Sequence, residues 1–135
     1  MDHQDITARR FGGLERLYGV PGAKQIRDAH IAVVGIGGVG SWAVEALARS
    51  GVGKLTLIDF DHIAESNINR QIHALDNTLG MSKVLAMQQR IAHINPQCVV
   101  VCTDEFVTPE NWPMVLNAQV DGVIDACDQI KAKTA

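Results

Sequence analysis

Short apolar runs alternate with longer amphipathic segments along most of this chain. The apolar runs are rich in β-branched residues and do not alternate with polar ones, which is typical of strands buried on both faces of a parallel sheet. Four strands are expected, at 30–35 (HIAVVG), 54–61 (KLTLIDFD), 98–106 (CVVVCTDEF) and 120–128 (VDGVIDACD). Three helices are expected between them, at 39–50, 81–94 and, more briefly, 108–116. This alternation with short connections predicts an α/β fold with a mainly parallel sheet and right-handed crossovers.

The two ends of the chain differ from this pattern. Residues 14–28 predict helical pieces that are broken at GVPG, where Pro21 lies between two glycines, and we take 1–28 as an N-terminal helical extension. After Asp128 the sequence QIKAKTA offers only the start of a helix. Four strands make an incomplete doubly wound sheet, so we expect 1–135 to be a single domain and the N-terminal part of a longer protein.

Composition adds limits rather than a function. The chain has 135 residues, 47% of them hydrophobic and 20% charged, as in an ordinary globular domain. A net charge of −3 gives no overall sign of nucleic-acid binding, so a local patch or a missing segment would have to contact any RNA. No apolar run approaches the roughly 20 residues of a membrane span, and the N-terminus does not resemble a signal peptide. A cytoplasmic location is therefore expected by default.

Three cysteines are too few and too dispersed for a zinc site or a disulfide framework. Cys98 and Cys102 lie four positions apart in an expected strand and so share one of its faces. Buried small apolar residues are favoured over a redox pair at these two positions.

A glycine-rich turn follows the first expected strand. Gly35, Gly37 and Gly40 form G-x-G-x-x-G, with Gly38 as a fourth glycine, and a helix is expected directly afterwards. An acid, Asp59, ends the second strand, 19 positions after Gly40. Glycines let backbone N–H groups approach phosphate at a helix N-terminus, and the acid can accept hydrogen bonds from a ribose. The context predicts a Rossmann-like nucleotide-binding domain.

Basic residues downstream bear on which nucleotide binds. Asn67 and Arg70 are three positions apart, on one side of a helical turn, and Lys83 begins the next helix. The glycine loop alone can hold the pyrophosphate of NAD, whereas a triphosphate extends more charge beyond the loop, for which Arg70 and Lys83 are suited. Asp128, just past the fourth strand, could hold Mg²⁺. Because these groups follow carboxyl ends of strands, they converge on one crevice, and ATP with Mg²⁺ is the favoured ligand.

Several motifs resemble a known superfamily. The chain resembles the E1-like, ubiquitin-activating-type adenylyltransferases in four stretches: VVGIGGVGSWAVEALARSGVGKLTLIDFD, NINRQIHAL, GMSKV and INPQC. Within that superfamily it resembles the tRNA threonylcarbamoyladenosine dehydratases in RRFGGLERLYG, GSWAVEALARSG, NRQIHAL and FVTPEN. The resemblance covers nearly the whole chain. It implies an enzyme that uses Mg·ATP to adenylate the carboxylate of threonylcarbamoyladenosine 37 in tRNA and then cyclises it, releasing AMP and pyrophosphate.

The same resemblance implies roles for individual residues. Gly38 would lie against the nucleotide and Asp59 on the ribose, while the stretch 66–70 would surround the phosphates, with Asn67 and Arg70 in direct contact. The nucleotide-binding set is then Gly35, Gly37, Gly38, Gly40, Asp59, Ser66, Asn67, Arg70 and Lys83. The catalytic set is Arg70, Lys83 and Asp128. Lys83 would neutralise charge in the adenylation transition state, and Asp128 would hold magnesium.

One departure from the superfamily and two further residues are left open. Relatives that activate small protein tails carry an arginine in RYxRQ that reaches the partner subunit's ATP, whereas this chain has Gly13 at that place. Arg10 or Arg16 could substitute. Cys127 lies beside the crevice, where a packed small residue is favoured over a thioester nucleophile, and His73 lies nearest the site without an assigned role.

Partners and alternatives follow from the resemblance. It implies modified tRNA as substrate, a homodimer, and a cysteine desulfurase or sulfur-acceptor system as a further partner. The alternative is an adenylyltransferase that activates the C-terminal glycine of a ubiquitin-like sulfur carrier, which a downstream CxxC pair and catalytic Cys would favour. A nicotinamide-dependent dehydrogenase is disfavoured by Arg70, Lys83 and Asp128. A non-catalytic nucleotide-binding fragment is a further reading of these 135 residues.

Overall fold

Four parallel strands form the centre of the molecule. The computed structural model describes the backbone of residues 3–116 and 119–127. The strands are β1 (His30–Val34), β2 (Lys54–Ile58), β3 (Val99–Thr103) and β4 (Gly122–Asp125). Their order is β3-β2-β1-β4, and Ile31 of β1 aligns with Leu55 on one side and Gly122 on the other. The predicted α/β, Rossmann-like parallel sheet is confirmed. The strand order reverses beside β1, which is the position where open α/β sheets bind ligands.

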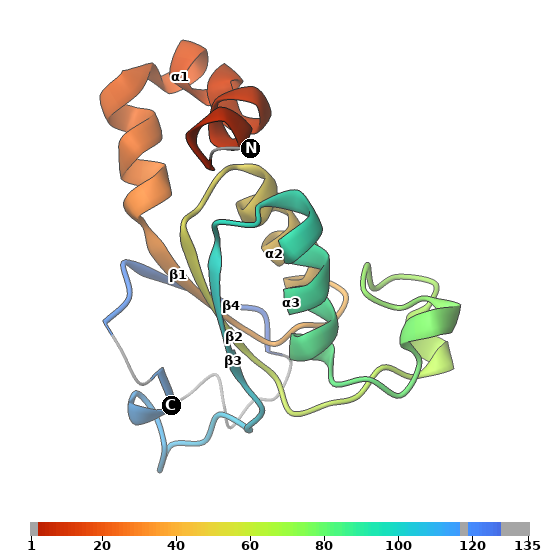
Figure 1. Ribbon diagram of the computed structural model, residues 1–135. Coiled ribbons are helices and arrows are strands. Elements are labelled where there is room, and N and C mark those ends of the chain that lie inside the picture. The colour runs from red at the N-terminus through yellow and green to blue at the C-terminus, as the bar shows by residue number, and fades with distance from the viewer. Residues whose placement is uncertain (1–2, 117–118, 128–135) are drawn as a thin grey trace.

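Two helices cover one face of this sheet. α2 (Gly40–Arg49) joins β1 to β2, and α3 (Lys83–Ile94) lies between β2 and β3, so both crossovers lie on the same side (Figure 1). The main core fills the space between these helices and the sheet, and its fully buried members include Val33, Ile36, Val44, Leu55, Leu57, Met87 and Ile91. This packing holds the N-termini of both helices at the carboxyl ends of the strands.

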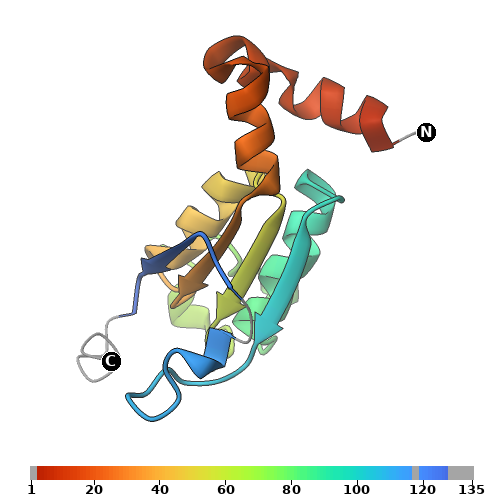
Figure 2. The same cartoon turned by 90° about the vertical axis from the view of Figure 1, so that its left-hand side faces the viewer.

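The connection from β3 to β4 passes over the opposite face, where Figure 2 shows it in blue in front of the sheet. Its Val115 and Leu116 pack against a second cluster that includes Ala32 and Ile58. The helix expected over 108–116 is wrong: the segment forms turns, and a 3₁₀ turn, η3, covers only Met114–Leu116. Pro113 explains the difference, because it lacks the N–H of a helical ladder and disfavours a helical residue before it.

The first helix projects from the amino end of the sheet. α1 (His3–Asp28) is interrupted at Gly19, which has φ 78° and ψ 165°, so the break predicted at GVPG is confirmed, although helix already forms before residue 14 (Figures 1 and 2). Arg10 donates from Nη1 to the carbonyl oxygen of Ile94 at 3.0 Å, and more distantly to that of His93. α1 therefore contacts the last turn of α3. Among the helices of the described ranges, none is both long enough and apolar enough to cross a membrane.

Candidate nucleotide-binding site

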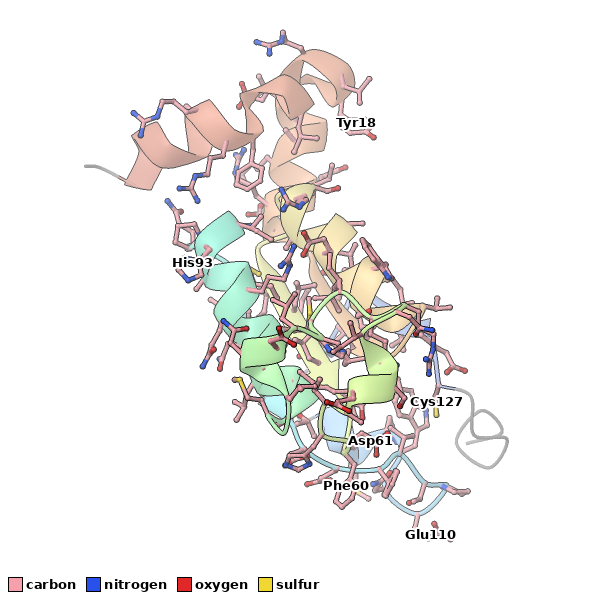
Figure 3. The ribbon with its side chains drawn as sticks, turned by 90° about the vertical axis from the view of Figure 1, so that its right-hand side faces the viewer. Tyr18, Phe60, Asp61, His93, Glu110 and Cys127 are labelled. Carbon is pink, nitrogen blue, oxygen red and sulfur yellow. The ribbon has the colours of Figure 1, made fainter. Side chains whose placement is uncertain are left out.

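A pocket of about 410 Å³ opens at the carboxyl ends of β1, β2 and β4. Its walls come from residues within 34–39, 58–61, 67–71 and 105–107, together with Lys83, Ala126 and Cys127. Figure 3 shows Phe60, Asp61 and Cys127 together at this end of the molecule, while His93 lies at the far end of α3, nearer α1. Asp59, Arg70 and Lys83, which come from separate segments of the chain, are thus brought to one place.

The four positions of the turn are occupied by glycine for two different structural reasons. Gly35 has φ +90°, and a Cβ there would lie 2.8 Å from the backbone of Ala126. A Cβ on Gly40 would lie 1.6 Å from the carbonyl oxygen of Gly35, so the turn itself requires both glycines. A Cβ on Gly37 or Gly38 would meet nothing closer than 3.7 Å. Gly37 and Gly38 line the pocket, so the close approach they permit is toward the pocket interior.

Backbone amides of the same turn are available as donors. Ser41 N–H donates to the carbonyl of Gly37, but within the described chain no hydrogen bond is made by the N–H groups of Gly37, Gly38, Val39 or Gly40. These amides precede or begin α2, where the helix dipole adds partial positive charge. Free amides, a positive helix end and open space beside two glycines are the features of a phosphate-binding loop.

Asp59 lies where β2 ends and is already engaged by the backbone. Its Oδ2 accepts the Ile36 N–H at 2.6 Å, and its Oδ1 accepts the Asp61 N–H at 2.8 Å. A carboxylate has about four acceptor positions, so both oxygens keep capacity for ribose hydroxyls. Asp59 therefore orders the glycine turn as well as lining the pocket.

Arg70 lies over the glycine turn. Its side chain lies 3.7 Å from the Cβ position of Gly38, and its Nη1 donates to the Ser66 carbonyl at 2.9 Å. Trp42 Nε1 donates to the carbonyl of Arg70 at 2.8 Å and holds this backbone against α2. Asn67 is buried and its Oδ1 accepts the Ala64 N–H at 2.9 Å, which leaves Nδ2 as its donor toward the pocket.

Lys83 is the first residue of α3 and is only 6% exposed. Its N–H donates to the carbonyl of Asp61 at 3.1 Å, which ties the start of α3 to the turn after β2. The structure records no ion pair of Lys83 with another described residue. A buried ammonium that lines a pocket without a carboxylate partner is suited to bind an anion.

Three residues of this region were missed by sequence reasoning. Gln71 lines the pocket, is 6% exposed, and its Oε1 has no hydrogen-bond partner in the described structure. Phe60 and Phe106 stack with ring centroids 4.4 Å apart and form an apolar wall. Phe60 had a signal in the sequence, because it directly follows Asp59, whereas the burial of Gln71 had none.

The cysteines separate into two environments. Cys98 and Cys102 pack against the main core, and burial raises the pKa of each thiol to about 11. The structure thus agrees with inert, partly buried small residues. Cys127 instead lines the pocket, and its N–H donates to Asp125 Oδ1 at 3.1 Å.

Several predicted residues are not brought into the pocket. Ser66 is exposed and contributes its carbonyl to Arg70 rather than a side chain to the lining, and Gly40 is buried behind the turn. Asp128, the predicted magnesium ligand, lies outside the described residues. No group of three or more His, Cys, Asp or Glu side chains that could hold a metal occurs in the described part of the chain. Arg10 lies on the last turn of α3, at the opposite end from the pocket.

Comparison with known proteins gives consistent matches. The ThiF family profile matches residues 10–135. The tRNA threonylcarbamoyladenosine dehydratases of Escherichia coli and Haemophilus influenzae are 51% and 53% identical over 97% of this chain, which covers 49% and 50% of those proteins. The structure of E. coli tRNA N6-threonylcarbamoyladenosine dehydratase in complex with ATP superimposes with a TM-score of 0.94, at 50% identity, over 98% of this chain and 55% of that one. The chain therefore spans about half the length of these relatives.

Proposed function

The chain belongs to the ThiF family, and from this premise we propose that it is the ATP-binding part of a tRNA threonylcarbamoyladenosine dehydratase. The observation that carries the proposal is one pocket that combines free loop amides, Arg70, Lys83 and Asp59. The identity of about half to the two bacterial dehydratases supports the substrate. The sulfur-carrier adenylyltransferase is not favoured by these relatives.

Each part of the pocket has a proposed role in binding ATP. The amides of the turn after β1 donate to phosphate oxygens, and Asp59 accepts from the ribose. Phe60 and Phe106 offer the apolar surface on which a purine base packs. Arg70 and Lys83 face the charge that extends beyond the loop, with Asn67 Nδ2 as a further donor.

The proposed chemistry is acyl adenylation followed by ring closure. A carboxylate oxygen of threonylcarbamoyladenosine attacks the α-phosphorus of ATP, and the bond to the bridging oxygen breaks to release pyrophosphate. A nucleophilic group of the same nucleoside then attacks the activated acyl carbon and gives up its proton, the C–O bond between the acyl group and the phosphate breaks, and AMP leaves. Negative charge moves onto the departing pyrophosphate in the first step, where the fixed cations Arg70 and Lys83 stabilise it most.

Further parts of the proposal extend beyond the described residues. Mg²⁺ is proposed from the chemistry of ATP, with Asp128 as its ligand. A tRNA substrate, a homodimer, a sulfur-acceptor partner and a cytoplasmic location complete it, and the family resemblance alone carries the last three. Because the chain spans half of its relatives, contacts with tRNA are expected mostly in the remaining sequence.

The proposal is tested in two measurements on the full-length protein. ATP with Mg²⁺ should raise the melting temperature, by the equivalent of about 2.7 kcal/mol at a hundredfold excess over Kd, whereas NAD at equal concentration should not. Single-turnover formation of AMP and cyclised nucleoside with threonylcarbamoyl-tRNA is the second measurement. AMP formation with a ubiquitin-like carrier instead of modified tRNA would favour the sulfur-carrier adenylyltransferase.

A further inference from the structure

The residue between the first two glycines of the turn is held on both sides of its backbone. Ile36 N–H donates to Asp59 Oδ2 at 2.6 Å, and the Ile36 carbonyl lies 2.8 Å from His73 Nε2. The Ile36 side chain is fully buried in the main core. Two consecutive peptide units, Gly35–Ile36 and Ile36–Gly37, are therefore fixed by the side chains of Asp59, directly after β2, and His73, in the segment before α3.

The contact defines the protonation of His73. A carbonyl oxygen only accepts, so Nε2 must carry a hydrogen, and in the neutral ring Nδ1 is then the unprotonated nitrogen. His73 is 2% exposed, and its Nδ1 has no partner in the described structure. Burial lowers the pKa of His73, and the hydrogen bond to Ile36 raises it. The charge of Lys83 lowers this pKa further, whereas the charge of Asp59 raises it. The net lowering favours the neutral ring at physiological pH, and that ring still donates from Nε2.

The hydrogen bond determines where the next amide points. In a trans peptide the C=O and the following N–H point to opposite sides of the chain. Because His73 fixes the Ile36 carbonyl toward the core, the Gly37 N–H is directed away from it. Gly37 lines the pocket, and its N–H makes no hydrogen bond to a described residue.

We propose that His73 is a positioning residue of the nucleotide site. Through its Nε2–H it holds the Ile36–Gly37 peptide in the orientation that presents the loop amides to a nucleotide phosphate, with Asp59 fixing the preceding peptide. The inference rests on the proposed function, in that the phosphate belongs to ATP. His73 itself touches neither nucleotide nor substrate.

Two amide substitutions in the full-length protein distinguish the two ring nitrogens. His73→Gln places an N–H donor near the position of Nε2, whereas His73→Asn places it near Nδ1, out of reach of Ile36. We expect His73→Asn to raise the Kd for ATP about tenfold, the scale of one lost positioning hydrogen bond, and His73→Gln to restore most of the affinity. The controls are His93→Gln, an exposed histidine at the far end of α3, and Ile91→Val, a conservative change in the main core (Figure 3).

Histidine-selective ¹⁵N NMR of the wild-type protein gives a readout that does not depend on a variant folding. The expected signature is the Nε2–H tautomer of the neutral ring, with a pKa below the ordinary histidine value. An Nδ1–H tautomer would overturn the inference. Equal ATP affinity in His73→Asn and wild type would also overturn it. So would a loss of ATP affinity in His73→Asn that is no larger than the loss in an Ile91→Val protein of the same melting temperature. Failure of the wild-type protein to bind ATP would instead overturn the proposed function.

Discussion

Glu45 of α2 accepts a hydrogen bond from Arg90 of α3, with 2.6 Å between Oε1 and Nε, and this ion pair joins the two helices that cover the sheet. Arg49 donates to the other oxygen at 2.7 Å. Burial opposes ionisation of Glu45, but the bonds from Arg90 and Arg49 outweigh it and hold the pKa of this carboxyl below its ordinary value. The pair therefore predicts an acid-sensitive contact between α2 and α3.

Arg90→Ala should destabilise the protein by about 1–3 kcal/mol, because a buried carboxylate loses its main donor. Arg49→Ala is the matched control and should cost less, since the Arg49 side chain is 59% exposed and that of Arg90 is 33% exposed. The measurement is urea unfolding at pH 7. Equal losses in both variants would contradict the ranking.

The same carboxyl predicts how stability depends on pH. The pKa of Glu45 is lower in the folded than in the unfolded state, so its contribution is fully present above about pH 4.5 and is lost as pH falls through the folded value. Unfolding free energies measured from pH 6 to pH 3 should therefore fall less steeply in Arg90→Ala than in wild type. A parallel curve for the variant would show that Glu45 is not responsible.

Gly38→Ala and Gly40→Ala should separate binding from folding. The new Cβ at position 38 would meet only the flexible Arg70 side chain at 3.7 Å, whereas at position 40 it would lie 1.6 Å from the Gly35 oxygen. We expect Gly38→Ala to keep its melting temperature within a few degrees and to bind ATP about tenfold or more weakly. Gly40→Ala should fail to fold or melt far lower. Unchanged ATP affinity in Gly38→Ala would remove Gly38 from the site.

Lys83→Ala in the full-length protein should lower turnover of threonylcarbamoyl-tRNA by about 10²-fold or more, with a much smaller loss of ATP affinity. The reason is that a fixed, buried cation interacts most strongly with the charge that develops on pyrophosphate. Lys54→Ala is the control, because Lys54 begins β2 at the end away from the pocket. Equal proportional losses of rate and affinity would make Lys83 a binding residue only.

Alkylation should report occupancy of the pocket. With a pKa of about 11, Cys98 and Cys102 are thiolate in only about one molecule per thousand at pH 8, so they should react slowly with iodoacetamide. Cys127 lines the pocket and should be modified first, and ATP should protect it. Peptide mass spectrometry would measure both rates. Modification of Cys127 that ATP does not slow would place the nucleotide elsewhere.

Much of the fold could be predicted from the sequence, because its strongest signals are local. The β-branched run HIAVV forms β1, and the glycines after it specify the turn into α2. The helix expected over 108–116 is wrong because Thr108 and Pro109 have the features of a helix start, whereas Pro113 interrupts the helical hydrogen-bond ladder. The pieces that the apolar pattern added to the strands, such as 59–61, instead form the turns that line the pocket.

The site was predictable in its residue types but not in its contacts. Asp59, Arg70 and Lys83 could be placed at strand ends because carboxyl ends of parallel strands share one edge. That His73 would reach Ile36, 37 positions earlier, depends on how the segment after β2 returns to the first turn, which no local pattern encodes. Gln71 was missed for the same reason, since its burial comes from that return.

The polarity of α3 has a consequence for stability. Its carboxyl end receives Arg10, a cation where the helix dipole is negative, but its first residue is Lys83, a cation where the dipole is positive, and its first turn contains no acid. Without a bound anion, the positive charge of Lys83 therefore interacts unfavourably with the positive end of the α3 dipole. An anion bound there relieves repulsion as well as adding contacts. Simple polyanions such as pyrophosphate should thus stabilise α3 even without a nucleoside.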